Sequence, residues 1–200
     1  SALRWCSCPE EDHGRPCPPT LSNARLRRMH VAILKPSDAP RYRTLMLEAY
    51  ARAADAFTST ATERSGEPES FWVRRIADPA GLSVAFGAID GHDLVGTVAL
   101  EFSARAKTKH KAHLIGMYVS AAARGAGAGR ALLRAAIAYA EGREGILRIN
   151  LTVTQDNEPA VTLYRSAGFE SFGVEPMAIL TPSGYKSKIH MSRAVARDAA

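Results

Sequence analysis

The chain has 200 residues and a mass of 21.5 kDa, the length of one domain with a hydrophobic core of its own. Apolar residues make up 46% and charged residues 23%, as in ordinary globular proteins, so the composition excludes a disordered or fibrous chain. Lys and Arg exceed Asp and Glu by 26 to 20, and the resulting net charge of +6 favours anionic ligands.

Composition and patterning also argue against two kinds of partner. The sequence contains no run of about 18 apolar residues and does not start with an apolar signal segment, so we expect no membrane contact and a cytoplasmic protein. The positive charges are dispersed and form no block interleaved with aromatic residues, so we do not expect nucleic acid binding. A phosphorylated cofactor is the preferred anionic ligand.

The segment 1–28 is rich in proline and has almost no aliphatic residues, so it is expected to be a disordered leader or an extension. Its thiols and imidazole could be read as a zinc cluster, but their spacing matches no standard zinc motif, and we expect no metal site. These residues are Cys6, Cys8, His13 and Cys17. The predicted domain is 29–200.

From residue 30 onward, apolar periodicity predicts alternating strands and helices. The expected strands are 31–34, 82–89, 94–102, 113–119, 146–153, 169–173 and 185–191, and the expected helices lie within 37–56, 67–76, 130–141 and 157–167. The Asp90-Gly91 pair predicts a hairpin, and the segment 57–66 reads as a loop. The predicted fold class is α/β, with a mixed, mostly antiparallel central sheet and one βαβ crossover.

A glycine-rich segment follows strand 113–119 and opens helix 130–141: Arg124-Gly125-Ala126-Gly127-Ala128-Gly129-Arg130. Free backbone N–H groups at a helix N-terminus bind phosphate oxygens, and a flanking arginine would add charge-assisted hydrogen bonds. The P-loop and dinucleotide patterns both fail, because no Lys-Ser or Lys-Thr follows and Arg130 and Leu132 replace the needed third glycine. A flexible connection is the alternative to a pyrophosphate site.

The sequence contains two motifs that are separated by one predicted helix and one predicted strand. They are Arg124-x-x-Gly127-x-Gly129 and Asn157-x-x-Ala160-x-x-Leu163-Tyr164-x-x-x-Gly168-Phe169. Together they resemble the two cofactor-binding segments of the GCN5-related N-acetyltransferase (GNAT) family, and the resemblance covers roughly 31–191. It implies splayed central strands, a possible homodimer and acetyl-CoA as cofactor. The implied activity is transfer of an acetyl group to a primary amine of a small molecule, peptide or protein by direct attack on the thioester. A non-catalytic acyl-CoA sensor or structural subunit of the same fold is the alternative.

The resemblance also implies which residues hold the cofactor. Strand backbone would pair with the pantetheine arm, the loop amides would bind the pyrophosphate, and the cap of the last helix would contact the arm. These positions are Met117, Tyr118, Val119, Arg124, Gly125, Ala126, Gly127, Ala128, Gly129, Arg130, Asn157 and Tyr164.

For catalysis, the resemblance implies that Tyr164 protonates the departing thiolate, and a phenol with a pKa of about 10 is a credible donor to a thiolate of about 8.5. It also implies that His113 accepts the proton of the amine, with water or Glu101 as the alternative. The acceptor site would be lined by Phe57, Thr58, Phe71 and Trp72, and Glu63 or Glu69 would attract a cation. Phe71 and Trp72 could instead pack their helix onto the sheet.

Overall fold

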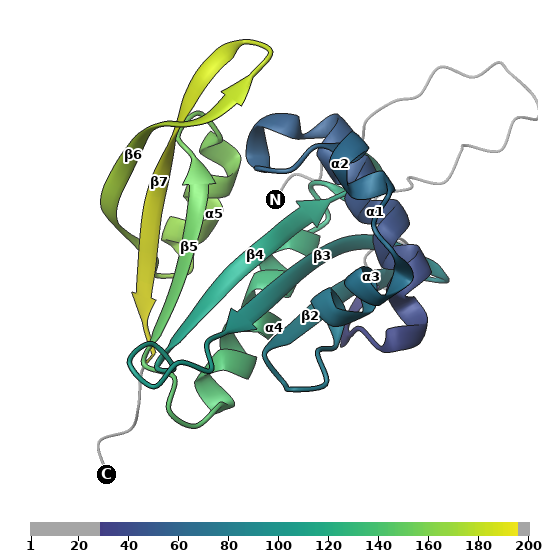
Figure 1. The fold of residues 1–200 in the computed structure, drawn as a ribbon, viewed down its shortest axis with the longest axis horizontal. Coiled ribbons are helices and arrows are strands. Elements are labelled where there is room, and N and C mark those ends of the chain that lie inside the picture. Colours follow the sequence, from purple (N-terminus) through teal and green to yellow (C-terminus); the bar gives the residue numbers. More distant parts are fainter. Residues whose placement is uncertain (1–28, 196–200) are drawn as a thin grey trace, which may run out of the picture.

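The computed structural model describes residues 29–195, so the predicted leader 1–28 and its cysteine–histidine cluster lie outside the described residues. Seven strands form one sheet in the order β1-β2-β3-β4-β5-β7-β6 (Figure 1). Neighbours are antiparallel except for the parallel pair β4 and β5, which the crossover through α4 connects. The mixed, mostly antiparallel sheet with one βαβ crossover is thereby confirmed. The strands are β1 (Met29–Ile33), β2 (Ser83–Asp90), β3 (Asp93–Phe102), β4 (Lys111–Val119), β5 (Arg148–Thr154), β6 (Glu170–Thr181) and β7 (Gly184–Ala194).

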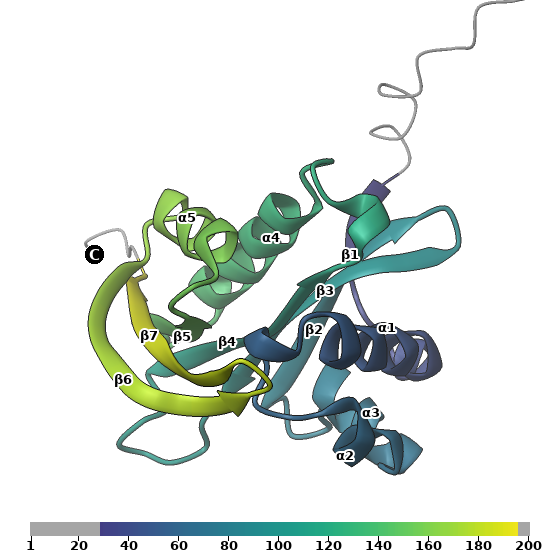
Figure 2. The same cartoon turned by 90° about the horizontal axis from the view of Figure 1, so that it is seen from above.

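Helices cover both faces of the sheet (Figure 2). On one face α4 and α5 pack over the larger core, and on the other α1 and α3 pack over a second core with Trp72 at its centre. The α-helices are α1 (Ala39–Arg52), α2 (Ala61–Ser65), α3 (Glu69–Ile76), α4 (Ala128–Gly142) and α5 (Glu158–Ser166). Short 3₁₀ turns occur at η1 (Pro36–Asp38), η2 (Ala54–Ala56) and η3 (Ala121–Ala123).

Helix α4 shows how the pattern dictates the packing. Its buried side chains recur three and four residues apart, which places them on one stripe facing the sheet. They are Ala128, Leu132, Leu133, Ala136, Ile137 and Ala140. The helix follows β4 in the chain and packs over β2, β3 and β4, and its first turn lies near Met117 and Val119 at the end of β4.

The two halves of the sheet separate between β4 and β5 (Figure 1). These strands pair at only three positions, of which His113 opposite Asn150 is the last. Further along, Gly116 and Met117 of β4 lie opposite the single residue Val98 of β3, which is a β-bulge. Gly116 has φ = 63°, a conformation that glycine adopts without strain. A bulge bends its strand, and the bend accompanies the divergence of β4 from β5.

The structure differs from the predicted elements in two regions. The predicted loop 57–66 contains the short helix α2, whose start is fixed by a capping box between Thr60 and Glu63. Strands β6 and β7 are both longer than predicted. In β6, Pro176 interrupts the apolar pattern but does not end the strand. The proline is accommodated in an irregular stretch between Glu175 and Ile179 of this edge strand.

Within residues 29–195, no helix combines the length and the hydrophobicity that crossing a bilayer requires.

Candidate active site

The loop between β4 and α4 exposes a row of unused backbone donors. Within the described chain, the N–H groups of residues 125–130 make no hydrogen bond to the protein, and the first N–H of the region to bond is that of Ala131, to the carbonyl of Gly127. Gly127, the N-cap of α4, has φ = 82° and supplies no capping side chain. Arg124 beside the loop donates through Nε to the carbonyl of Val119 at 3.1 Å. Free N–H groups at the positive end of a helix dipole fit the pyrophosphate of a nucleotide cofactor.

The loop gives a direct test of this fit. Gly127→Ala is expected to weaken CoA binding about tenfold, measured by titration calorimetry, since a left-handed backbone costs other residues roughly 1–2 kcal/mol. No atom lies within 4 Å of the added methyl group, so the effect would come from the backbone and not from a clash. Gly142→Ala, at the other end of α4 and equally free of contacts, is the matched control and should bind CoA like the wild type. Equal affinity of both variants would contradict this role of the loop.

A cavity of about 310 Å³ opens where β4 and β5 part. Beyond His113, β4 has β3 on one side and no strand partner on the other, so a ligand chain carrying amides has a free strand edge to pair with. Asn157 lies at the wall of this cavity and accepts a hydrogen bond from the N–H of Ala160 at 3.3 Å. The lining residues that matter for the chemistry are Glu101, Met117, Thr154, Asn157, Tyr164 and Lys188 from the sheet side, and Phe57, Thr58, Ser59, Arg64 and Arg75 from the helical side.

Tyr164 reaches the cavity from α5. Its ring packs edge-on against Phe169, with the centroids 6.0 Å apart, and the residue is 5% exposed. Its hydroxyl makes no hydrogen bond to the described part of the chain. Burial raises the pKa of Tyr164 well above its ordinary value, so the phenol keeps its proton at physiological pH. This side chain therefore presents a protonated, free hydroxyl at the wall of the cavity.

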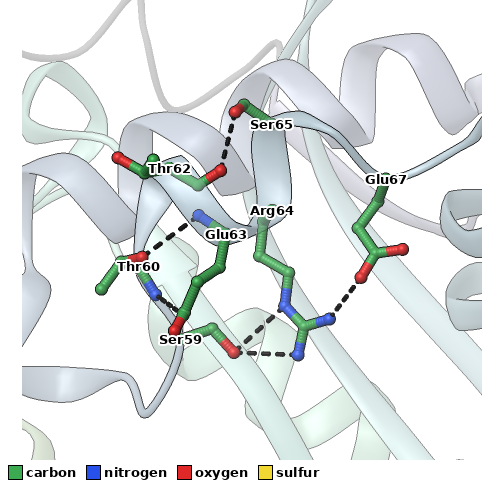
Figure 3. Close-up of polar contacts among 7 residues, drawn as sticks. All are labelled: Ser59, Thr60, Thr62, Glu63, Arg64, Ser65 and Glu67. Atoms are coloured by element: carbon green, nitrogen blue, oxygen red, sulfur yellow. Dashed lines mark hydrogen bonds and ion pairs between the residues drawn. The ribbon is translucent and has the colours of Figure 1, made fainter.

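Basic side chains outnumber acidic ones around the cavity. Arg64, Arg75 and Lys188 line it, and Glu101 is the one carboxylate among the described lining residues. Glu67 pairs with Arg64, Nη1 to Oε1 at 2.9 Å, while the same guanidinium holds Ser59 Oγ through Nε and Nη2 (Figure 3). Arg64 therefore connects the segment before α2 to the segment after it, and the carboxylate of Glu67 largely neutralises its charge.

Arg75 is the less fully partnered arginine of the helical wall. Its Nε is buried and has no hydrogen-bond partner in the structure described, and its guanidinium lies 5.6 Å from the ring centre of Phe71. The guanidinium also lies close enough to Tyr42 and Glu101 to interact with them electrostatically. A planar guanidinium presents donors in the geometry of a carboxylate, and an unsatisfied buried donor is unfavourable until a partner arrives. Arg75 thus suits an anionic group of a ligand.

Several of the expected site residues come together here. Phe57, Thr58, Met117, Asn157 and Tyr164 all line the cavity. The side chain of Tyr118 points instead toward α1, where its hydroxyl donates to Glu48 Oε1 at 3.1 Å.

Other expected residues lie elsewhere. His113 is exposed on the last paired position of β4, outside the cavity lining, whereas its register partner Glu101 lies at the wall. Trp72 does not line the acceptor site either, because it is fully buried between α3 and the sheet, and Phe71 lies under the guanidinium groups of Arg64 and Arg75. Both aromatic side chains fit the alternative expectation, in which they pack helix α3 onto the sheet.

The two expected cation-attracting carboxylates are also outside the cavity lining. Glu63 Oε2 accepts the N–H of Thr60 at 2.7 Å and so serves the capping box (Figure 3). Glu69 lies in the first turn of α3.

Sequence reasoning missed Arg75 and Lys188. Arg75 follows Phe71 by four residues, a spacing that places both on one face of α3, and this was the available signal. Lys188 had no comparable local signal, since its burial depends on the strands on both sides of β7.

The comparisons with known proteins agree with this geometry. The sequence model of the acetyltransferase (GNAT) family matches residues 46–169. The chain is 31% identical over 125 residues to the L-amino acid N-acetyltransferase AaaT of Escherichia coli (strain K12), covering 62% of this chain and 76% of that protein. It is 36% identical over 108 residues to the N-alpha-acetyltransferase RimI of Mycobacterium tuberculosis (strain ATCC 25618 / H37Rv), covering 54% of this chain and 63% of that protein.

Among solved structures, the fold matches yncA from Salmonella typhimurium, which was solved with its cofactor acetyl-CoA, with a TM-score of 0.71 at 18% identity. The match covers 86% of this chain and 96% of that one. The chain therefore belongs to the acetyltransferase (GNAT) family, and it is an enzyme of the kind that transfers an acetyl group from acetyl-CoA to an amine.

Proposed function

We propose that the enzyme acetylates the primary amine of a small acceptor that carries a carboxylate, by direct attack of the amine on the thioester. One observation carries this choice of acceptor: Arg75, whose guanidinium makes no salt bridge within the described residues and whose buried Nε has no hydrogen-bond partner there, lines the same cavity as Tyr164. A carboxylate on Arg75 would fix the orientation of an acceptor whose amine points toward the parting strands. The name of the Escherichia coli relative, an L-amino acid N-acetyltransferase, supports the same class.

Acetyl-CoA supplies the acetyl thioester. The free amides of residues 125–130 would hold its pyrophosphate, and the unpaired edge of β4 from Leu114 to Val119 would hold its arm. Asn157 would contact the arm at the cap of α5. These groups would position the reacting carbon, which is the positioning contribution to the rate.

Tyr164 would act at the leaving sulfur. As the new C–N bond forms and the C–S bond breaks, the hydroxyl gives its proton to the sulfur, which leaves as a thiol. The tyrosine then regains a proton from the nitrogen of the new amide, so the phenol returns to its starting state. General acid help of this type contributes about 10²–10⁴-fold to a rate.

A thiol-release assay with acetyl-CoA tests the proposal. Each L-amino acid is compared with its carboxamide, which has nearly the same shape but no negative charge, at a pH where the neutral fraction of each amine is taken into account, and with a peptide that has a free N-terminus. We expect the free amino acids to be acetylated with a kcat/KM at least about tenfold above their carboxamides. A preference for the peptide would instead favour an activity like the one in the name of the mycobacterial relative. CoA binding without acetylation of any amine would favour the non-catalytic sensor.

A further inference from the structure

Lys188 is a buried lysine at the active-site cavity. It lies on β7 between β5 and β6, in register with Thr154 on one side and Glu175 on the other. It is 7% exposed and lines the cavity together with Tyr164. Lysine side chains are almost never this buried unless they are paired, so its environment calls for an explanation.

Within the described residues, the side-chain nitrogen Nζ of Lys188 makes no hydrogen bond and no ion pair, while its backbone takes part in the strand pairing of β7. Lys186, two residues earlier on the same strand, shows the ordinary alternative: its Nζ contacts Asp156 Oδ2 at 2.7 Å. The carboxylate nearest to Lys188 in the sheet, Glu175, is engaged by His190 Nε2 at 3.2 Å. Lys188 therefore has no anionic partner of its own.

The groups around Lys188 act on its proton affinity in different directions. Burial lowers the pKa of Lys188, and Glu175 on β6 opposes this effect. On β5 its register neighbour Thr154 is uncharged, and Tyr164 of α5 is a neutral phenol. Across the cavity lie Arg64 and Arg75 with Glu101. An ammonium group at this wall is thus only partly compensated, and Nζ releases its proton more readily than that of an exposed lysine.

We propose that Nζ of Lys188 is the proton acceptor that converts the ammonium group of the acceptor into the neutral amine before attack. The inference rests on the proposed function. The acceptor enters as R–NH₃⁺, one of its protons moves to the neutral Nζ, and the lone pair of R–NH₂ becomes available for the thioester carbon. The Lys188 ammonium then returns its proton to water, which balances the one proton that the overall reaction releases. Tyr164 handles the second proton, at sulfur.

Two substitutions separate a base from a binding site for the acceptor carboxylate. Lys188→Gln is expected to lose about 10²-fold or more in kcat/KM at pH 7, because only the small neutral fraction of the free amine can then react. Lys188→Arg is expected to lose about as much, since a guanidinium keeps its proton in proteins. Lys186→Gln is the matched control on the same strand and should retain activity.

The pH profile adds a second readout. In the wild type, kcat/KM should rise with pH through the Lys188 ionisation and then level off, because a neutral lysine deprotonates the acceptor and an acceptor amine that is already neutral needs no base. In Lys188→Gln the rate should keep rising with pH until the acceptor amine itself is neutral, so the deficit shrinks toward alkaline pH. An unchanged profile shape with a raised KM, partly rescued in Lys188→Arg, would overturn the proposal in favour of carboxylate binding.

A measurement without turnover completes the test. In protein labelled with ¹³C at the lysine ε-carbon, the resonance that disappears in Lys188→Gln should titrate at a lower pH than the other lysines. Titration with the other lysines would overturn the inference, as would wild-type activity of Lys188→Gln. If the wild-type enzyme acetylates no amine, the proposed function has failed on its own, before any variant is compared. CoA affinity, measured on every variant, verifies that the substitutions leave the fold intact.

Discussion

Tyr164→Phe is expected to lower kcat by about 10²–10⁴-fold while CoA affinity stays within about twofold of the wild type. The substitution removes a hydroxyl that has no hydrogen-bond partner in the described structure, so no buried group is left unsatisfied. The packing of the ring against Phe169 is retained. Loss of activity with intact binding is the result expected when an interaction is made only in the transition state. Steady-state kinetics and calorimetry on the same preparation measure the two quantities.

Tyr139→Phe is the matched control. Tyr139 lies on α4, where its ring contacts Phe86 and Phe102 and not the cavity. Its hydroxyl is therefore expected to leave kcat unchanged. If Tyr164→Phe kept full activity, the thiolate would leave without this proton, and the direct role of the phenol would have to be abandoned. If neither variant nor the wild type transferred acetyl groups, the result would favour the alternative of a non-catalytic acyl-CoA sensor.

The sequence predicted the fold well where the decisive interactions are local. Helix α4 was readable because its buried positions recur at helical spacing, and the β2–β3 hairpin because Asp90-Gly91 favours a tight turn. Helix α2 carried a readable signal too, the Thr60 and Glu63 capping box, but five residues are too few for a hydrophobic period. The length of β6 was hidden because an edge strand tolerates Pro176 in an irregular stretch, which no local rule anticipates.

The residues of the candidate site show the same distinction between local and non-local interactions. The loop amides and Tyr164 were predictable because one short segment contains each of them together with its structural context. His113 was harder to place, since its relation to the cavity depends on where β4 and β5 stop pairing, and that point lies directly after it. Arg75 and Lys188 come from α3 and β7, which meet the cavity only in the folded sheet. Their proposed functions depend on a missing partner, and a missing partner is visible only in three dimensions.

Arg75→Gln is expected to lower kcat/KM for a carboxylate-bearing acceptor about 100-fold or more. Hydrogen bonds to charged groups contribute about 1.5–3 kcal/mol each, and every 1.4 kcal/mol is a factor of ten. The same substitution should change kcat/KM for the carboxamide analogue only slightly, because that acceptor offers no charge to the guanidinium. Arg75→Lys should restore little, since an ammonium group lacks the planar pair of donors.

The comparison of the two acceptors is what makes this prediction specific to binding. Arg75 also lies over the ring of Phe71, so its removal could disturb α3, but a disturbed wall would impair acid and carboxamide alike. Arg74→Gln removes the neighbouring, exposed arginine of α3 and is expected to affect neither acceptor. An equal loss for both acceptors in Arg75→Gln would assign Arg75 to packing. A loss confined to the acid places the carboxylate of the acceptor on the helical wall, opposite the strands that part to admit the thioester.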